Sequence, residues 1–138
     1  MAGASVDRSK VLGKMGYHIG IAFQLLDDVM DFTGATHTMG KEPWNDLRQG
    51  KITLPLLLAI KEHPALKADL EKRHSDAHWP ELYAKLKKYL SEPLIRTQCE
   101  EFIQEHLQGA RQALSVLPVS PYRTSILSLL EYLARRDR

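Results

Sequence analysis

Residues 23–31 restrict the fold most, because they combine a helical apolar pattern with three carboxylates within five residues. Asp31 follows Asp27 by four residues and Asp28 by three, which places all three on one sector of an α-helix. Two like charges about 4 Å apart repel by roughly 4 kcal/mol at an effective dielectric near 20. Because a packed helix cannot separate such charges, the pattern predicts a bound cation.

The residue types indicate which cation. Oxygen-only clusters favour hard divalent ions, and Mg²⁺ typically takes one or two protein carboxylates together with water and phosphate oxygens. The alternative is that the aspartates form a solvated face near a helix end. A helix C-terminus disfavours acidic side chains, and Lys41 and Lys51, each after a glycine, supply the point charges that a diphosphate requires. These features favour a site for Mg²⁺ and diphosphate.

Composition limits the other possibilities. The 138 residues, 43% of them hydrophobic, suffice for one domain with a core, so we expect a single domain over residues 1–138. The net charge of +2 and the interleaved signs argue against a nucleic-acid partner. A single cysteine, Cys99, excludes an intrachain disulfide and fits a buried position. No apolar run is long enough for a membrane span and no signal-peptide pattern is present, so we expect a cytoplasmic protein.

The hydrophobic periodicity predicts an all-α fold of about five to six helices, since no segment alternates as a strand would. Serine, threonine and proline residues mark several helix starts. The expected helices cover residues 5 to about 32, 54–60, 65 to about 73, 79–90, 93–117 and 121–133.

Three local features carry further expectations. The first is the segment 34–50, which lacks periodicity and is longer than most loops, so it is a functional candidate. The second is the segment 54–60, which is so apolar that it should be buried nearly all round. The third is the set of Gly13, Gly16 and Gly20 in the first helix, which would allow another helix to approach closely.

Residues 23–55 resemble the second aspartate-rich region of the trans-isoprenyl diphosphate synthases, the polyprenyl synthetases. The matching residues are Phe23-Gln24, Asp27-Asp28-x-x-Asp31, Gly34, Gly40-Lys41, Asp46, Gly50-Lys51 and Thr53-x-Pro55. The family's first acidic motif is normally followed by a pair of arginines, which this sequence lacks. The match is therefore to the second motif, and the resemblance implies part of the family's helical bundle.

The resemblance implies a metal-dependent ionisation of an allylic prenyl diphosphate. Asp27 and Asp31, with Asp28 in support, would hold Mg²⁺ that bridges the diphosphate. Lys41 and Lys51 would neutralise the charge that builds as diphosphate leaves. The double bond of isopentenyl diphosphate would then attack the allylic cation.

The resemblance also assigns roles to Gln24, near the reacting end of the substrate, and to Phe23, in the channel for the growing chain. This sequence departs from the family in two respects. It is much shorter than family members, and it lacks the first aspartate-rich motif and the basic residues that bind isopentenyl diphosphate. Trp44 stands where the family usually has glycine in the lysine-containing loop.

Three hypotheses remain. The chain is the C-terminal half of a polyprenyl diphosphate synthase and is inactive alone, or it is an accessory subunit of a heteromeric synthase, or it is a helical interaction domain without a ligand. Retention of the aspartates and both lysines favours the first, because an accessory chain has no physical need for them. The first two predict uncovered apolar helix faces, and hence a homo-oligomer or a complementary synthase subunit.

Overall fold

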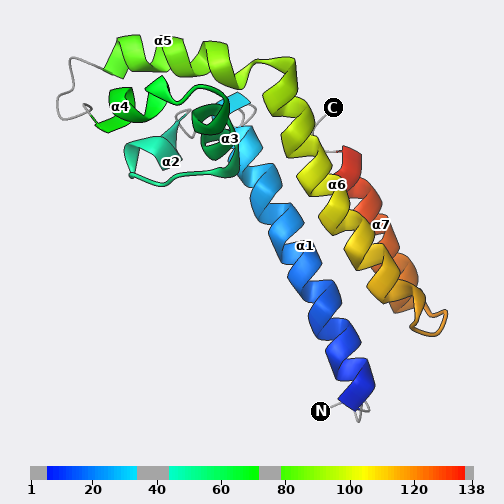
Figure 1. The fold of residues 1–138 in the computed structure, drawn as a ribbon. Helices are drawn as coiled ribbons and strands as arrows, with labels where there is room; N and C mark the ends of the chain where they lie inside the picture. The colour runs from blue at the N-terminus through cyan, green and yellow to red at the C-terminus, as the bar shows by residue number, and fades with distance from the viewer. Residues whose placement is uncertain (1–5, 34–43, 72–78, 136–138) are drawn as a thin grey trace. The chain divides into compact units, whose positions relative to one another are not determined.

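The computed structural model describes residues 6–33, 44–71 and 79–135, which form seven α-helices and no strand (Figure 1). The helices are α1 (Val6–Thr33), α2 (Asn45–Arg48), α3 (Leu54–Glu62), α4 (Ala65–Glu71), α5 (Trp79–Leu90), α6 (Pro93–Ser115) and α7 (Pro121–Arg135). The predicted all-α class is confirmed. The helix absent from the sequence prediction is α2, a single turn within the segment expected to be a loop.

The chain divides into two compact units. One comprises Met1–Leu26 and Glu101–Arg138, and the other comprises Asp27–Glu100. Helices α1 and α6 each contribute residues to both units. The single domain over residues 1–138 stays a prediction.

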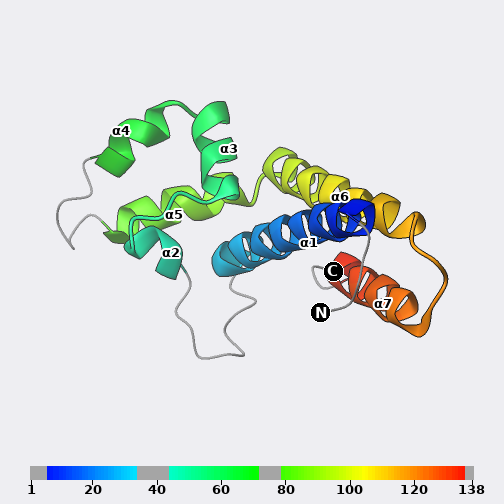
Figure 2. The same ribbon diagram turned by 90° about the horizontal axis from the view of Figure 1, so that it is seen from below.

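In the first unit, α6 runs antiparallel to α1, and α7 returns along α6 (Figures 1 and 2). Met15 of α1 is buried with Ala113 and Leu114 of α6. Partly buried side chains surround them, namely Ile19, Leu117, Ile126 and Leu127. Ser120 caps α7, since its hydroxyl accepts a hydrogen bond from the Arg123 amide at 3.2 Å. The apolar stripes of three helices thus form one core.

In the second unit, α3 packs against α4 and α5. Leu56, Leu58 and Ala59 of α3 are buried, but Leu57 is 52% exposed. The prediction of nearly all-round burial is therefore wrong at Leu57, because the neighbouring helices leave one face of α3 uncovered. Cys99 is buried, as predicted.

The glycines of α1 are not approached by any described helix. A Cβ atom added at Gly13, Gly16 or Gly20 would meet no atom within 4 Å outside its own helix in the described part of the chain. Leu12 and Phe23, which are apolar side chains of α1, are also exposed. The expected close helix contact is therefore absent from the described residues.

Gly109 in α6 differs from these three glycines. A Cβ atom there would lie 2.5 Å from Cε1 and 2.6 Å from Nδ1 of His18. Real side chains do not approach so closely, so α1 and α6 can pack as they do because residue 109 has no side chain.

None of the described helices is both long enough and apolar enough to cross a membrane.

We predict opposite effects for two alanine substitutions in helices. Gly109→Ala should lower the free energy of unfolding, because overpacking costs about 1–3 kcal/mol. Gly16→Ala should raise it by up to about 1 kcal/mol, because alanine favours a helix and the site has open space around it. Urea unfolding of the two variants beside the parent tests this, and a change of the same sign in both would contradict the packing at His18.

Candidate functional site

Three aspartates occupy the C-terminal end of α1. Asp27, Asp28 and Asp31 are all half-buried, and the last turn of α1 contains no basic residue. The negative end of the helix dipole therefore adds to the carboxylate charges. Stabilisation must come from groups outside this helix.

One such group is the start of α3. Oδ2 of Asp28 accepts a hydrogen bond from the backbone N–H of Leu54 at 3.4 Å. Leu54 is the first residue of α3, where amides lack partners within the helix and the dipole is positive. Asp28 thus helps to fix the start of α3 against the end of α1.

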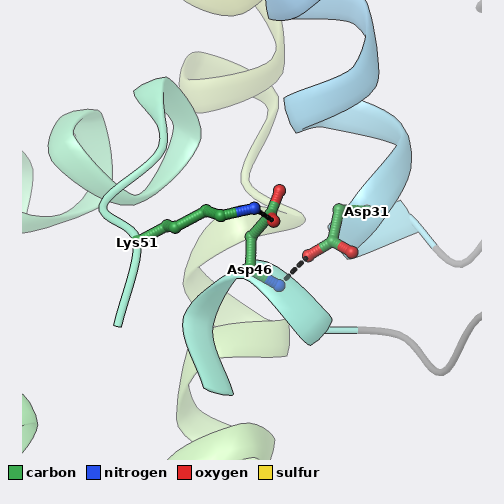
Figure 3. Close-up of polar contacts among 3 residues, drawn as sticks. All are labelled: Asp31, Asp46 and Lys51. Carbon is green, nitrogen blue, oxygen red and sulfur yellow. Dashed lines mark hydrogen bonds and ion pairs between the residues drawn. The ribbon is translucent and has the colours of Figure 1, made fainter. Parts of the chain in front are cut away.

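A second group is the backbone of α2. The N–H of Asp46 donates to Oδ2 of Asp31 at 3.4 Å (Figure 3). The N–H of Trp44 donates to the carbonyl oxygen of Asp31 at 3.3 Å. Asp31 therefore anchors the segment that leads into α2 through both its side chain and its main chain.

The third group is the ammonium of Lys51. Its Nζ donates to Oδ1 of Asp46 at 2.6 Å (Figure 3), and its backbone N–H donates to the Asp46 carbonyl oxygen at 2.9 Å. The Asp46 side chain is 13% exposed and that of Lys51 is 58% exposed. Asp46 therefore fixes the lysine at two points while the lysine remains accessible to a ligand.

The charges around Lys51 raise its pKa. The hydrogen bond from Lys51 to Asp46 and the Asp46 charge contribute most, and the charges of Asp31 and Asp27 add to them. The predicted lysine thus lies within electrostatic reach of the predicted aspartates. Asp46 is among the residues that carry the family resemblance, but no role was predicted for it. It holds Lys51 in place, and its position five residues before Lys51 is the sequence signal for this contact.

Trp44 adopts a backbone conformation that favours glycine. Its φ is 68°, in the left-handed region, which costs a residue with a side chain roughly 1–2 kcal/mol. Its ring stacks on Tyr83 at a centroid distance of 5.7 Å and lies 6.5 Å from the ring of Phe32. These ring contacts offset the backbone strain at residue 44. The family that the sequence resembles usually has glycine at this position.

The donor set fits a hard divalent cation shared with a ligand. The described ranges, 6–33, 44–71 and 79–135, contain no cluster of three or more histidine, cysteine or acidic side chains that could hold a metal ion by itself. Mg²⁺ needs only one or two carboxylates when phosphate and water supply the other oxygens. Asp27 and Asp31, one helical turn apart, can supply such a pair.

The remaining predicted site residues are Lys41, Phe23 and Gln24. Lys41 is outside the described residues. Phe23 and Gln24 are exposed on α1 and belong to the first compact unit.

We predict that Asp46→Asn lowers the pKa of Lys51 toward its ordinary value, because the charge that favours the ammonium is lost. The ion pair stabilises the fold below the ordinary lysine pKa, and this contribution disappears as the pH rises through the folded pKa of Lys51. NMR titration of lysine side chains measures the shift. Asp69→Asn is the matched control, since it should lower only the pKa of Lys85. An unchanged Lys51 pKa in Asp46→Asn would contradict the pairing.

Known proteins match nearly the whole chain. It is 33% identical over 135 residues to heptaprenyl diphosphate synthase component 2 of Bacillus subtilis (strain 168), covering 98% of this chain and 38% of the relative. It is 38% identical over 125 residues to a prenyl transferase of Synechocystis sp., covering 91% of this chain and 38% of the relative. The chain thus spans about two fifths of the length of these relatives.

Solved structures share the fold. Heptaprenyl diphosphate synthase from Staphylococcus aureus superposes with a TM-score of 0.83 at 29% identity, covering 98% of this chain and 42% of that one. Polyprenyl synthase from Caulobacter crescentus CB15, complexed with calcium and isoprenyl diphosphate, gives 0.80 at 30% identity with the same coverage. The sequence profile of the polyprenyl synthetase family matches residues 1–90. The chain therefore belongs to the polyprenyl synthetase family and represents part of its all-α fold.

Proposed function

We propose that this chain supplies the part of a trans-prenyl diphosphate synthase that binds Mg²⁺ and the diphosphate of an allylic substrate. It requires a complementary part for chain elongation. The observation that carries the proposal is the fixed ammonium of Lys51, which Asp46 holds within electrostatic reach of Asp27 and Asp31. Carboxylates and a lysine side by side provide both partners of a metal diphosphate, namely metal ligands and a cation for phosphate oxygens.

In this proposal the acidic residues and the lysine have different roles. Asp27 and Asp31 hold the metal, and Asp28 keeps the start of α3 in place through its contact with Leu54. Mg²⁺, when bound, supplies positive charge to the diphosphate oxygens. Lys51 adds a second cation on the same unit and so stabilises the leaving group.

The same proposal covers the remaining predicted residues. Lys41 provides a further cation for the diphosphate, Gln24 lies near the reacting end of the substrate, and Phe23 lines the channel for the growing chain. The allylic C–O bond breaks and its electron pair leaves with the diphosphate. The double bond of isopentenyl diphosphate then attacks the allylic carbon, and a proton is lost to restore a double bond.

Two comparisons support this assignment. The Caulobacter relative was crystallised with calcium and isoprenyl diphosphate, and calcium, like Mg²⁺, takes oxygen ligands. The chain covers only 38% of its Bacillus subtilis relative, so the proposal requires further residues for the complete reaction. The first motif and the site for isopentenyl diphosphate would come from that complementary part.

A second candidate function is an accessory subunit of a heteromeric synthase. The name of the Bacillus subtilis relative, component 2, indicates an enzyme with more than one component. In that case this chain would bind a catalytic subunit through its exposed apolar residues, such as Leu12 and Phe23 on α1. The aspartates would then be dispensable for activity.

We predict that Mg²⁺ together with an allylic diphosphate raises the melting temperature, because a ligand that binds only the folded state stabilises it. The gain is about 2.7 kcal/mol at one hundred times the Kd. Asp27→Asn combined with Asp31→Asn should abolish the rise, whereas Asp69→Asn, a surface aspartate paired with Lys85, should retain it. Absence of a ligand-dependent shift in the parent protein would refute the proposed site.

We predict that the chain alone forms no elongated prenyl product and that mixing it with a polypeptide containing the first aspartate-rich motif restores prenyl transfer. Radiolabelled isopentenyl diphosphate incorporation measures this. Adding Asp27→Asn and Asp31→Asn to this chain should eliminate the restored activity if it supplies metal ligands. Full activity of that mixture would favour the accessory function instead, and product from the chain alone would exclude the need for a complement.

A further inference from the structure

The first compact unit contains a cluster of polar rings with no role in the proposed function. His18 of α1 and His106 of α6 are 88 residues apart, yet their Nδ1 atoms are 3.1 Å from each other. Both residues are half-buried. The ring of Tyr17 lies 5.4 Å from that of His18 and 6.0 Å from that of His106. Two imidazoles on different helices are thus held with their nitrogens together.

The separation of these nitrogens matches that of two ligands on one metal ion. With Zn–N bonds of about 2.0–2.1 Å, nitrogens 3.1 Å apart subtend about 95–102° at the ion. This angle lies between the octahedral and tetrahedral values, so the distance between the two nitrogens suits a shared ion.

We propose that His18 and His106 form a two-histidine site for a late first-row divalent cation such as Zn²⁺, with water completing the coordination. Imidazole nitrogens suit these ions, whereas the carboxylates at the end of α1 suit Mg²⁺. The part of the chain that the structure describes offers no third histidine, cysteine or acidic ligand here. Water would therefore have to supply the remaining ligands.

The surroundings of His18 favour the neutral form of its imidazole. Burial lowers the pKa of His18, as do the neighbouring His106 and Lys14, while Glu105 acts in the opposite direction. A lowered pKa favours the neutral imidazole, which is the form that binds metal. Gly109 lies against the His18 ring and allows it to sit close to α6.

The competing explanation is a neutral histidine pair joined by an N–H···N hydrogen bond. In that pair one Nδ1 carries a proton, whereas a shared metal needs the lone pairs of both Nδ1 atoms, with the protons on Nε2. The two explanations predict different responses to added zinc.

The test is titration of the purified chain with Zn²⁺ in excess Mg²⁺, followed by calorimetry and thermal unfolding. We expect one equivalent of Zn²⁺ to bind and to raise the melting temperature, because the ion links α1 to α6 only in the folded chain. His18→Gln and His106→Gln should each weaken binding by roughly tenfold or more, since each removes one of two protein ligands. His63→Gln is the matched control, because His63 belongs to the second unit and pairs with Glu92.

Two further measurements test whether Zn²⁺ binds at the two histidines and not at the aspartates of α1. Asp27→Asn with Asp31→Asn should leave the Zn²⁺ response intact, which separates this site from the proposed diphosphate site. NMR of the histidine ring nitrogens in the parent protein should show both Nδ1 signals shifting with Zn²⁺, and this readout needs no variant to fold. Equal Zn²⁺ affinity in the parent and both histidine variants, or unshifted Nδ1 signals, would overturn the proposal.

Discussion

Negative charge at the C-terminal end of α1 is the constraint on which the second unit depends. The helix dipole and the carboxylates of Asp28 and Asp31 have the same sign there, so the helix end needs donors from elsewhere. The amides of Asp46 and Leu54 supply these donors to Asp31 and Asp28. The ammonium of Lys51, which is hydrogen-bonded to Asp46, adds its positive charge near Asp31 and Asp27. The lysine that a diphosphate would contact is therefore placed by interactions that also stabilise the fold.

The helices could be predicted where local chemistry specifies them. Ser120 and Pro121 mark the start of α7 because a hydroxyl cap and a proline at the first turn favour a helix start regardless of tertiary contacts. Helix α2 could not be predicted, because a single turn has no apolar period. The exposure of Leu57 also escaped prediction, since it depends on how many helices cover α3 and not on the segment itself.

The same distinction applies to the candidate site. The placement of Asp27 and Asp31 on the same face of the helix could be predicted from their spacing alone. The motif resemblance pointed to Lys51. The sequence could not show that Asp46 holds Lys51 with both its carboxylate and its carbonyl oxygen, because this depends on the path of the chain after α2. Contacts such as that of His18 with His106 are even harder to predict from the sequence, because 88 residues separate the partners.

Trp44 connects the start of α2 to α5 through its ring. A glycine at φ 68° would leave the start of the segment 44–51, which carries Lys51, free to change conformation at little cost. Tryptophan in the same conformation is stacked on Tyr83, and the Tyr83 hydroxyl in turn accepts a hydrogen bond from Arg48 at 2.6 Å. A change of backbone conformation at residue 44 would therefore also disturb this ring contact. Tryptophan at this position therefore gives the segment 44–51 a contact with α5 that glycine could not make.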